Sequence, residues 1–198
     1  MLNNRRTSPI RDWMNAEQAD PGTEVVTLGG GCFWCTEAVF NSIEGVLKVE
    51  PGYSGGRPED ANYGRVSTGR TGHTEVVQVT FDPEVITLRE ILEIFFATHN
   101  PTTLNRQGAD VGPQYRSVVF YHDEEQKRIA EEIVERLDSE RIWDNPIVTK
   151  VEPYEALYRA EDYHMKYYER NREQPYCRLV IDPKIVKLTE RFKDKLKK

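Results

Sequence analysis

Two cysteines lie three residues apart in this chain, directly after a run of three glycines at residues 29–31. Before the glycines, residues 25–28 predict a short buried strand, and after them residues 36–40 suit a helix. Glycine adopts backbone conformations that are closed to other residues, so the glycine run predicts a tight turn. The segment therefore predicts a strand, a turn and a helix, with Cys32 and Cys35 at the start of the helix.

The start of a helix is a place where a cysteine becomes reactive. The first backbone N–H groups of a helix have no partner within it and favour a nearby negative charge. We therefore expect the pKa of Cys32 to fall from about 8.5 toward neutrality. Because the thiolate is the nucleophilic form of cysteine, the segment points to sulfur chemistry.

Length and charge limit the classes of protein to consider. The chain has 198 residues and a formal net charge of −6. That length is enough for a hydrophobic core and fits one domain. Residues 1–22 are polar and lack a clear hydrophobic period, so we expect a flexible arm there and a single domain over residues 23–198. The mildly acidic charge disfavours a nucleic-acid partner.

The sequence also bears on location. No segment approaches the ~20 apolar residues that a membrane span needs, and no apolar segment follows Arg5 and Arg6 as a secretory signal requires. We therefore expect a cytoplasmic protein without a membrane partner. Three cysteines are too few for a disulfide scaffold, and in a reducing compartment a close pair is more often catalytic or metal-binding. Nothing suggests an obligate interface, so we expect a monomer.

The rest of the chain alternates strand-like and helix-like segments. Strands are predicted at residues 74–81, 115–121 and 147–151, and helices after Thr87, at residues 123–139 and 160–170, and from about residue 183. This mixed order favours an α+β fold, a two-layer sandwich of a mixed sheet on helices, over a doubly wound parallel sheet. Residues 51–72 and 100–114 are rich in glycine and tyrosine and exceed the usual connection length, so we interpret them as functional loops.

The cysteine pair by itself leaves four interpretations open. It suits a redox nucleophile with its resolving thiol, since residues three apart on a helix share a face and close a disulfide with modest adjustment. A thioredoxin-like disulfide exchanger uses the same spacing. Half of a zinc site is a third interpretation, although the isolated Cys177 and four scattered histidines offer no second close pair. Two buried cysteines with a structural role are the fourth.

Three further motifs follow the pair along the chain. They are YGRVSTGRTGHTE from Tyr63 to Glu75, GADVGPQYRS from Gly108 to Ser117, and EDYH from Glu161 to His164. Together with GCFW at residues 31–34, these motifs resemble the A-type peptide methionine sulfoxide reductases, over about residues 25–177. The resemblance implies a mixed α/β sandwich of ferredoxin-like type. It also implies a catalytic domain that reduces methionine-S-sulfoxide, free or in proteins, in the repair of oxidative damage.

The resemblance implies catalytic roles for four residues. Cys32 matches the nucleophile, and Glu75 matches the acid that protonates the sulfoxide oxygen. Tyr63 and Tyr115 match two tyrosines that hydrogen-bond the same oxygen. For Glu75 to donate a proton near pH 7, burial must raise its pKa from about 4.3 by roughly two units or more. We expect that burial because Glu75 stands at the start of an apolar strand.

The resemblance also implies how the substrate is bound. Phe33 and Trp34 match the aromatic pocket around the S-methyl group of the substrate. Asp110 and His164 match positions that line the substrate cleft. No bound metal or other cofactor is implied, and thioredoxin, or dithiothreitol in vitro, would supply the reducing dithiol.

Two thiols are candidates for the step that follows. The family's chemistry leaves a sulfenic acid on Cys32, which a second thiol converts to a disulfide. Many members carry glycine at the position of Cys35, and members often resolve through a cysteine near the C-terminus, where Cys177 lies. We favour Cys35 because it needs little chain movement, whereas Cys177 would travel on a mobile tail. A relay through both thiols stays open.

Two rival functions make different predictions. A thioredoxin-like exchanger would reduce insulin disulfides and would need a proline-bearing loop that faces the cysteine pair, which the sequence does not identify. A binding module would hold methionine-rich partners in the aromatic pocket and would still bind them after Cys32→Ser.

Overall fold

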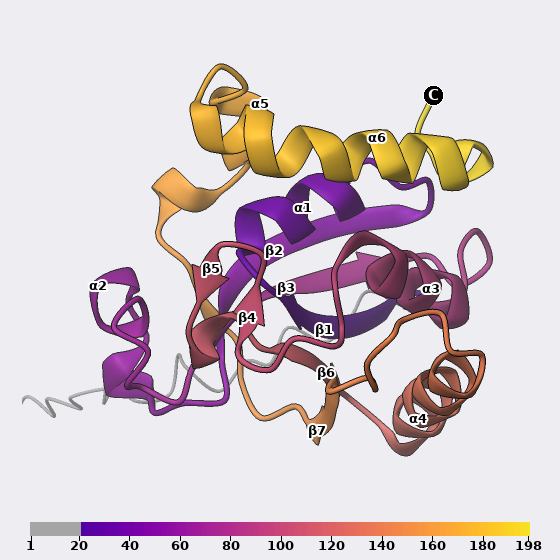
Figure 1. The fold of residues 1–198 in the computed structure, drawn as a ribbon, viewed down its shortest axis with the longest axis horizontal. Coiled ribbons are helices and arrows are strands. Elements are labelled where there is room, and N and C mark those ends of the chain that lie inside the picture. Colours follow the sequence, from indigo (N-terminus) through magenta and orange to yellow (C-terminus); the bar gives the residue numbers. More distant parts are fainter. Residues whose placement is uncertain (1–20) are drawn as a thin grey trace, which may run out of the picture.

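A six-stranded sheet forms the centre of the computed structural model, which describes residues 21–198 (Figure 1). Apart from its last two residues, the predicted arm at residues 1–22 lies outside the described residues. The strands run in the order β7-β6-β1-β3-β2-β8. Their bounds are β1 (Glu24–Gly30), β2 (Val46–Ser54), β3 (Thr74–Phe81), β6 (Ser117–Tyr121), β7 (Lys150–Pro153) and β8 (Tyr158–Arg159). Strands β6 and β7 are parallel and the other neighbouring pairs are antiparallel, so the predicted mixed sheet is confirmed.

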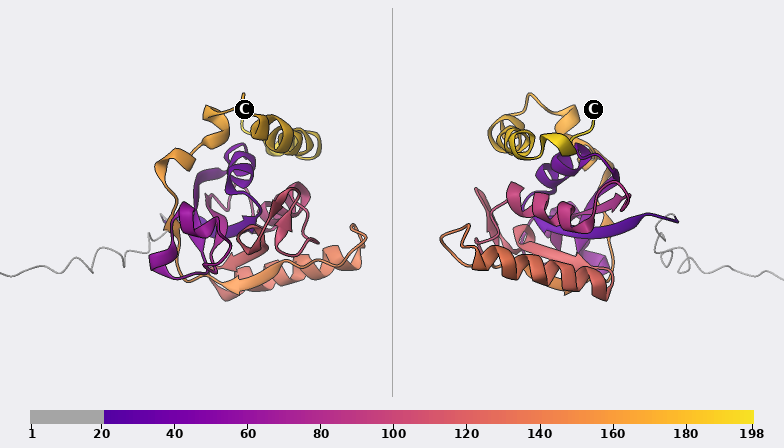
Figure 2. Two further views of the ribbon diagram at one scale, coloured as in Figure 1. Left: turned by 60° about the vertical axis from the view of Figure 1, so that its left-hand side comes forward. Right: turned by 90° about the vertical axis from the view of Figure 1, so that its right-hand side faces the viewer.

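The helices pack against this sheet and against one another. They are α1 (Phe33–Asn41), α2 (Tyr63–Val66), α3 (Leu88–Thr98), α4 (Glu124–Ser139), α5 (Tyr167–Arg170) and α6 (Asp182–Arg191). Helix α1 packs on β2 and β3, α4 packs on α3, β6 and β7, and α6 lies over α1 and α3 (Figure 2). The predicted α+β class is confirmed. Among the described residues, no helix is both long and apolar enough to cross a membrane.

Alternation along β3 decides which side chains face the helices. Val77 and Val79 lie in the main core beneath the helices, whereas Val76 lies in a small apolar cluster on the opposite face. Since successive side chains of a strand point to opposite faces, Glu75 shares the face of Val77. The first part of β3 therefore carries a carboxyl group into the helix side of the sheet.

Local signals set the bounds of two helices correctly. Helix α3 begins after Thr87, whose hydroxyl accepts a hydrogen bond from the backbone of Glu90 while the Glu90 carboxylate accepts one from the backbone of Thr87. These two hydrogen bonds form a capping box, which begins the helix predicted after Thr87. Helix α4 begins after Asp123, whose carboxylate accepts a hydrogen bond from Gln126 N.

Strand β2 was not predicted, and its second half falls within residues 51–72, which we expected to be a loop. The strand lies between β3 and β8, and Pro51 and Gly52 stand in the middle of it. Proline and glycine are rare inside strands, which conceals this one in the sequence. Here Pro51 O accepts a hydrogen bond from Ala160 N at 2.9 Å, so the proline still bonds through its carbonyl group.

The predicted helix at residues 160–170 is also wrong. The chain forms a 3₁₀ turn at Asp162–His164, and α5 then begins at Tyr167. Between them Lys166 adopts a left-handed conformation with φ of 52°, which ends any continuous helix. The buried carboxylate of Glu37, on α1, accepts a hydrogen bond from Lys166 N at 2.7 Å and holds this reversal in place.

Smaller differences from the prediction concern the residues at which elements begin and end. The strand predicted at residues 115–121 begins at Ser117, because Tyr115 ends a 3₁₀ turn at Pro113–Tyr115. The strand predicted at residues 147–151 is β7, displaced toward the C-terminus. The last helix is α6, and a π-helical turn at Cys177–Ile181 precedes it.

Candidate active site

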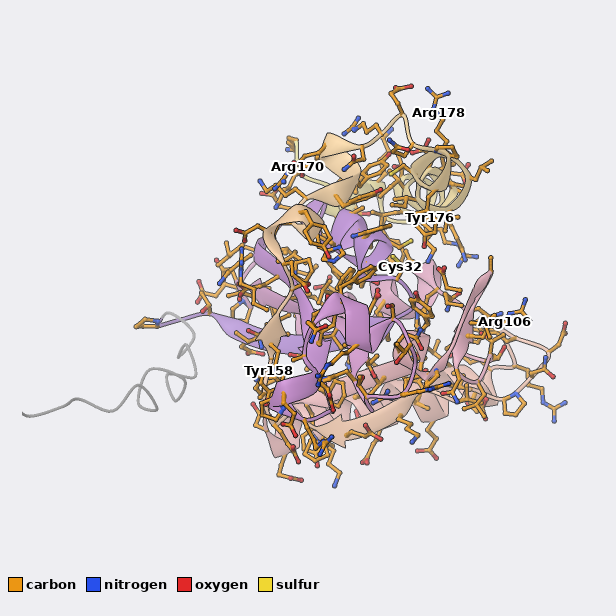
Figure 3. All side chains as sticks on the ribbon, turned by 90° about the vertical axis from the view of Figure 1, so that its left-hand side faces the viewer. Cys32, Arg106, Tyr158, Arg170, Tyr176 and Arg178 are labelled. Atoms are coloured by element: carbon orange, nitrogen blue, oxygen red, sulfur yellow. The ribbon has the colours of Figure 1, made fainter. Side chains whose placement is uncertain are left out.

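A cavity of about 190 Å³ opens at the start of α1. In Figure 3, two of its lining residues, Cys32 and Tyr176, lie close together near the segment that carries Arg178. Seven predicted site residues line the cavity, and Tyr176 is an eighth that we did not predict. The predicted ones are Cys32, Phe33, Trp34, Tyr63, Glu75, Asp110 and Tyr115. They come from segments that are far apart in the sequence, and the fold brings them together.

The glycine run positions Cys32, although not in the way we predicted. Only Gly31 of the three has a left-handed conformation, with φ of +100°, whereas Gly29 and Gly30 are extended residues of β1. These two positions require close packing instead: a Cβ atom on Gly30 would lie 2.7 Å from the Phe95 ring, and one on Gly29 would lie 2.8 Å from Thr74 Cγ2. After this turn Cys32 occupies the N-cap position of α1, at the start of the helix as predicted.

Glu75 faces the same helix start. One of its carboxyl oxygens accepts a hydrogen bond from Phe33 N at 3.1 Å, and the side chain is 2% exposed. Burial raises the pKa of Glu75 to about 8, although the Phe33 hydrogen bond lowers it in part. The carboxyl group is therefore mostly protonated at neutral pH, and it lines the cavity. The predicted direction of the pKa shift is confirmed.

The predicted low pKa of Cys32 is wrong for the site without substrate. Burial raises the pKa of Cys32 well above its ordinary value, and its hydrogen bond to Cys35 raises it further. The same hydrogen bond lowers the pKa of Cys35 to about 7. One of the first backbone N–H groups of the helix, that of Phe33, bonds to Glu75. The two thiols therefore titrate as a pair, and the hydrogen bond between them favours ionisation of Cys35 over that of Cys32.

Tyr63 and Tyr115 contribute neutral hydroxyl groups to the cavity. Tyr63 is the first residue of α2, and Tyr115 belongs to the 3₁₀ turn before β6. Both side chains are half-buried, and burial, followed by the charge of Glu75, raises the pKa of each phenol. Each phenol therefore keeps its proton at physiological pH and is available as a hydrogen-bond donor.

Aromatic rings close another side of the cavity. The indole of Trp34 stacks on the ring of Tyr167, with centroids 3.7 Å apart and planes 6° from parallel. Phe33 is almost fully buried. His164 does not line the cavity, contrary to our prediction; it is fully buried behind these rings, and its Nδ1 accepts a hydrogen bond from Trp34 Nε1 at 3.0 Å.

Comparison with known proteins identifies the family. The family model described as peptide methionine sulfoxide reductase matches residues 24–196. The chain belongs to the peptide methionine sulfoxide reductase family. It is thereby an oxidoreductase, and the resemblance predicted from the four motifs is confirmed.

Relatives and solved structures agree with this assignment. Peptide methionine sulfoxide reductase MsrA of Sulfolobus acidocaldarius is 59% identical over 172 residues, which cover 87% of this chain and 97% of that protein. The reduced form of Mxr1 from Saccharomyces cerevisiae is 37% identical with a TM-score of 0.74, over 81% of this chain and 92% of Mxr1. A structure of the same Mxr1 in complex with Trx2 is 29% identical with a TM-score of 0.52, over 77% and 91% of the two chains.

The two candidate resolving thiols of this family member have different surroundings. Cys35 is hydrogen-bonded to Cys32 and has its Sγ atom 3.7 Å from Tyr176 Oη. Cys177 is fully buried at the start of the π-helical turn, and no hydrogen bond joins it to the pair. The C-terminal segment that was expected to be a mobile tail is packed: Glu44 N donates to Lys195 O at 2.7 Å, and Lys197 N donates to Ser42 O at 3.0 Å.

Tyr176 is the cavity residue that sequence reasoning missed. Its hydroxyl donates to Asp110 Oδ2 at 2.8 Å and also contacts the thiol of Cys35. The sequence offers one signal for it, since it stands directly before Cys177, but that neighbour points away into the core. Among residues 21–198, no three histidine, cysteine or acidic side chains lie close enough together to hold a metal ion.

Proposed function

We propose that this chain reduces the S-epimer of methionine sulfoxide, free or within proteins, to methionine, with Cys32 as the nucleophile. The observation that supports the proposal is that Cys32 and the protonated carboxyl group of Glu75 line one cavity with Phe33 and Trp34. A sulfoxide sulfur is a poor electrophile until its oxygen is protonated. A neutral acid beside the thiol removes that obstacle.

In the first step the Cys32 sulfur attacks the sulfoxide sulfur while Glu75 gives its proton to the sulfoxide oxygen. Tyr63 and Tyr115 donate hydrogen bonds to the same oxygen as its negative charge develops. The thiol proton of Cys32 replaces the proton that Glu75 has given. The attack forms a bond between the two sulfur atoms. That bond and the S–O bond of the substrate then break as the hydroxyl group moves to the Cys32 sulfur, so that methionine is released and Cys32 is oxidised to a sulfenic acid.

In the second step Cys35 attacks the sulfenic sulfur of Cys32, and water leaves as the disulfide forms. The hydrogen bond between the two thiols and the low pKa of Cys35 favour Cys35 over Cys177 for this step. An external dithiol then supplies two electrons and two protons and restores both thiols. We assign this role to thioredoxin, and the complex of the similar Mxr1 with Trx2 supports the assignment. The cycle calls for no bound cofactor.

The activity is tested with each epimer of methionine sulfoxide and dithiothreitol. We expect the S-epimer to be consumed and the R-epimer to remain, and we expect Cys32→Ser to abolish turnover. Consumption of neither epimer, or of the R-epimer alone, would overturn the proposal. Reduction of insulin disulfides at a comparable rate would favour a disulfide exchanger instead.

The resolving thiol is tested by mass spectrometry after one turnover without reductant. We expect a disulfide between Cys32 and Cys35. In Cys35→Ser we expect the sulfenic acid to persist long enough to be trapped by dimedone, whereas Cys177→Ser keeps the normal disulfide. A bridge between Cys32 and Cys177 in the wild type would overturn this part of the proposal.

A further inference from the structure

Two polar side chains lie behind the cavity and take no part in the proposed chemistry. They are Glu161 and His164, which belong to the EDYH motif. His164 is fully buried, and its Nδ1 accepts the indole N–H of Trp34 at 3.0 Å. Because an indole nitrogen can only donate, Nδ1 must be the unprotonated nitrogen, and the neutral ring carries its proton on Nε2. Burial lowers the pKa of His164, which keeps the ring neutral.

The other imidazole nitrogen points toward a carboxylate. His164 Nε2 lies 3.7 Å from Glu161 Oε2 and has no hydrogen-bond partner among the described residues. Burial opposes the ionisation of Glu161, but hydrogen bonds from Tyr63 N and the hydroxyl of Tyr53 outweigh it and hold its pKa below the ordinary value. The carboxylate is therefore charged, and its field favours the tautomer with the proton on Nε2.

The same carboxylate reaches the opposite wall of the cavity. Glu161 Oε1 accepts a hydrogen bond from Tyr63 N at 2.9 Å, at the start of α2. One side chain therefore connects the tyrosine proposed to bind the sulfoxide oxygen with the histidine that anchors Trp34.

Three aromatic rings of the cavity contact the imidazole. The ring centroid of His164 lies 4.9 Å from that of Phe33, 5.7 Å from that of Trp34 and 4.7 Å from that of Tyr63. These rings leave a cavity of only about 190 Å³. The imidazole is the common support behind them, so its position sets how far the rings can separate.

We propose that His164, oriented by Glu161, is a positioning residue that makes the cavity selective for an S-methyl group over larger S-alkyl groups. This inference rests on the proposed function. A fixed apolar pocket discriminates one methylene by about 10- to 200-fold. Loss of the indole anchor allows Trp34 to rotate and admits the larger group.

The test compares kcat/KM for the S-epimers of methionine sulfoxide and ethionine sulfoxide, which differ by one methylene. His164→Gln keeps an amide near the position of Nε2 but removes the acceptor at Nδ1. We expect it to lower kcat/KM for methionine sulfoxide and to reduce the preference for methyl over ethyl by about tenfold. His164→Asn keeps an oxygen near the position of Nδ1, and we expect it to retain more of the preference.

Controls separate a positioning role from general loss of structure. His122→Asn removes a histidine that bonds to Thr27 and stacks on Tyr154 away from the cavity, and the methyl preference should stay unchanged. Thermal unfolding shows whether each variant folds. Should His164→Gln fail to fold, Glu161→Gln provides the same test. It removes the charge that favours the His164 tautomer with its proton on Nε2, so we again expect a reduced methyl preference.

The outcomes are distinguishable from failure of the proposed function. A wild-type protein that reduces neither sulfoxide would overturn both the proposed function and this inference. An active wild type whose methyl preference is unchanged in folded variants at both His164 and Glu161 overturns this inference alone.

Discussion

At the scale of single residues, the site depends on a carboxyl group that keeps its proton. Glu75 is 2% exposed, and burial raises its pKa to about 8. A general acid is most effective when its pKa lies near the working pH. The same burial that makes Glu75 a useful acid also makes its ionised form costly to the folded state, so activity and stability both depend on pH through this residue.

The rate should respond to pH through Glu75. In the wild type we expect kcat/KM to fall as pH rises through about 8, because the acid loses its proton. Glu75→Gln should lower activity at pH 7 by ~10²–10⁴-fold and lose the part of the pH profile that Glu75 contributes. Steady-state kinetics from pH 6 to 9 measures both. An unchanged profile in Glu75→Gln would assign the titration to another group.

The contribution of Glu75 to stability should depend on pH in the opposite sense to that of most carboxyl groups. Unfolded Glu75 loses its proton near pH 4.5, whereas the folded protein holds it to about pH 8. The unfolded state therefore binds fewer protons over this window, so the contribution of Glu75 to stability is full below pH 4.5 and is lost as pH rises through about 8. Each pKa unit is worth about 1.4 kcal/mol. Glu75→Gln should remove this loss, as urea unfolding at pH 5 and pH 8.5 would show.

The hydroxyl of Tyr176 should affect the pKa of Cys35, the proposed resolving thiol. It contacts Cys35 Sγ and helps to hold the pKa of Cys35 at about 7, after the larger effect of Cys32. We expect Tyr176→Phe to raise that pKa, seen as a shift of thiolate absorbance at 240 nm to higher pH. The matched control is Tyr168→Phe, which removes a hydroxyl bonded to Asp182 and should leave the titration unchanged.

At the scale of elements, the turn between β1 and α1 positions Cys32, the proposed nucleophile. Gly31 needs its positive φ, and Gly30 needs the space that the Phe95 ring leaves. Gly30→Ala and Gly31→Ala should each lower the free energy of unfolding by about 1–3 kcal/mol, through overpacking in the first and backbone strain in the second. Gly64→Ala is the control, since its Cβ would meet nothing closer than 3.6 Å and its φ is not positive. Equal stability of all three variants would contradict this account of the turn.

At the scale of the whole molecule, the C-terminal segment closes over α1. Its end bonds to residues 42–44, and Lys195 pairs with Glu90 at 2.6 Å. Cys177 is fully buried where this segment begins, in the π-helical turn before α6. Because this segment is packed, Cys177 would have to be exposed by a local opening before it could exchange.

Removal of residues 193–198 should favour that opening. It eliminates the backbone hydrogen bonds of Lys195 and Lys197 to the chain after α1. We expect iodoacetamide to modify Cys177 faster in the shortened chain, with a lower free energy of unfolding. Mass spectrometry over time measures the rate at Cys177. Identical rates in the two chains would show that the C-terminal bonds do not control access.

Local sequence determined the elements whose signals lie within a few residues of one another. The capping box of α3, the capping Asp123 of α4 and the run of strand-forming residues in β3 each specify their element, and all three are correct. Strand β2 was not predicted because Pro51 and Gly52 disfavour a strand by local propensity. Pairing with β3 and β8 overrides that propensity. The helix at residues 160–170 failed because Glu37, more than a hundred residues away, fixes Lys166 in a reversed conformation.

The sequence by itself determined the family and seven residues of the cavity, because the chemistry of a sulfoxide calls for a thiol, an acid and aromatic walls in recognisable motifs. Only the tertiary structure decided that Cys32 has a raised pKa, that His164 lies behind the cavity and that Tyr176 completes it. The physical reason is that burial and hydrogen bonding across the fold, rather than the neighbouring residues in the chain, set the charge of a thiol and the position of a ring.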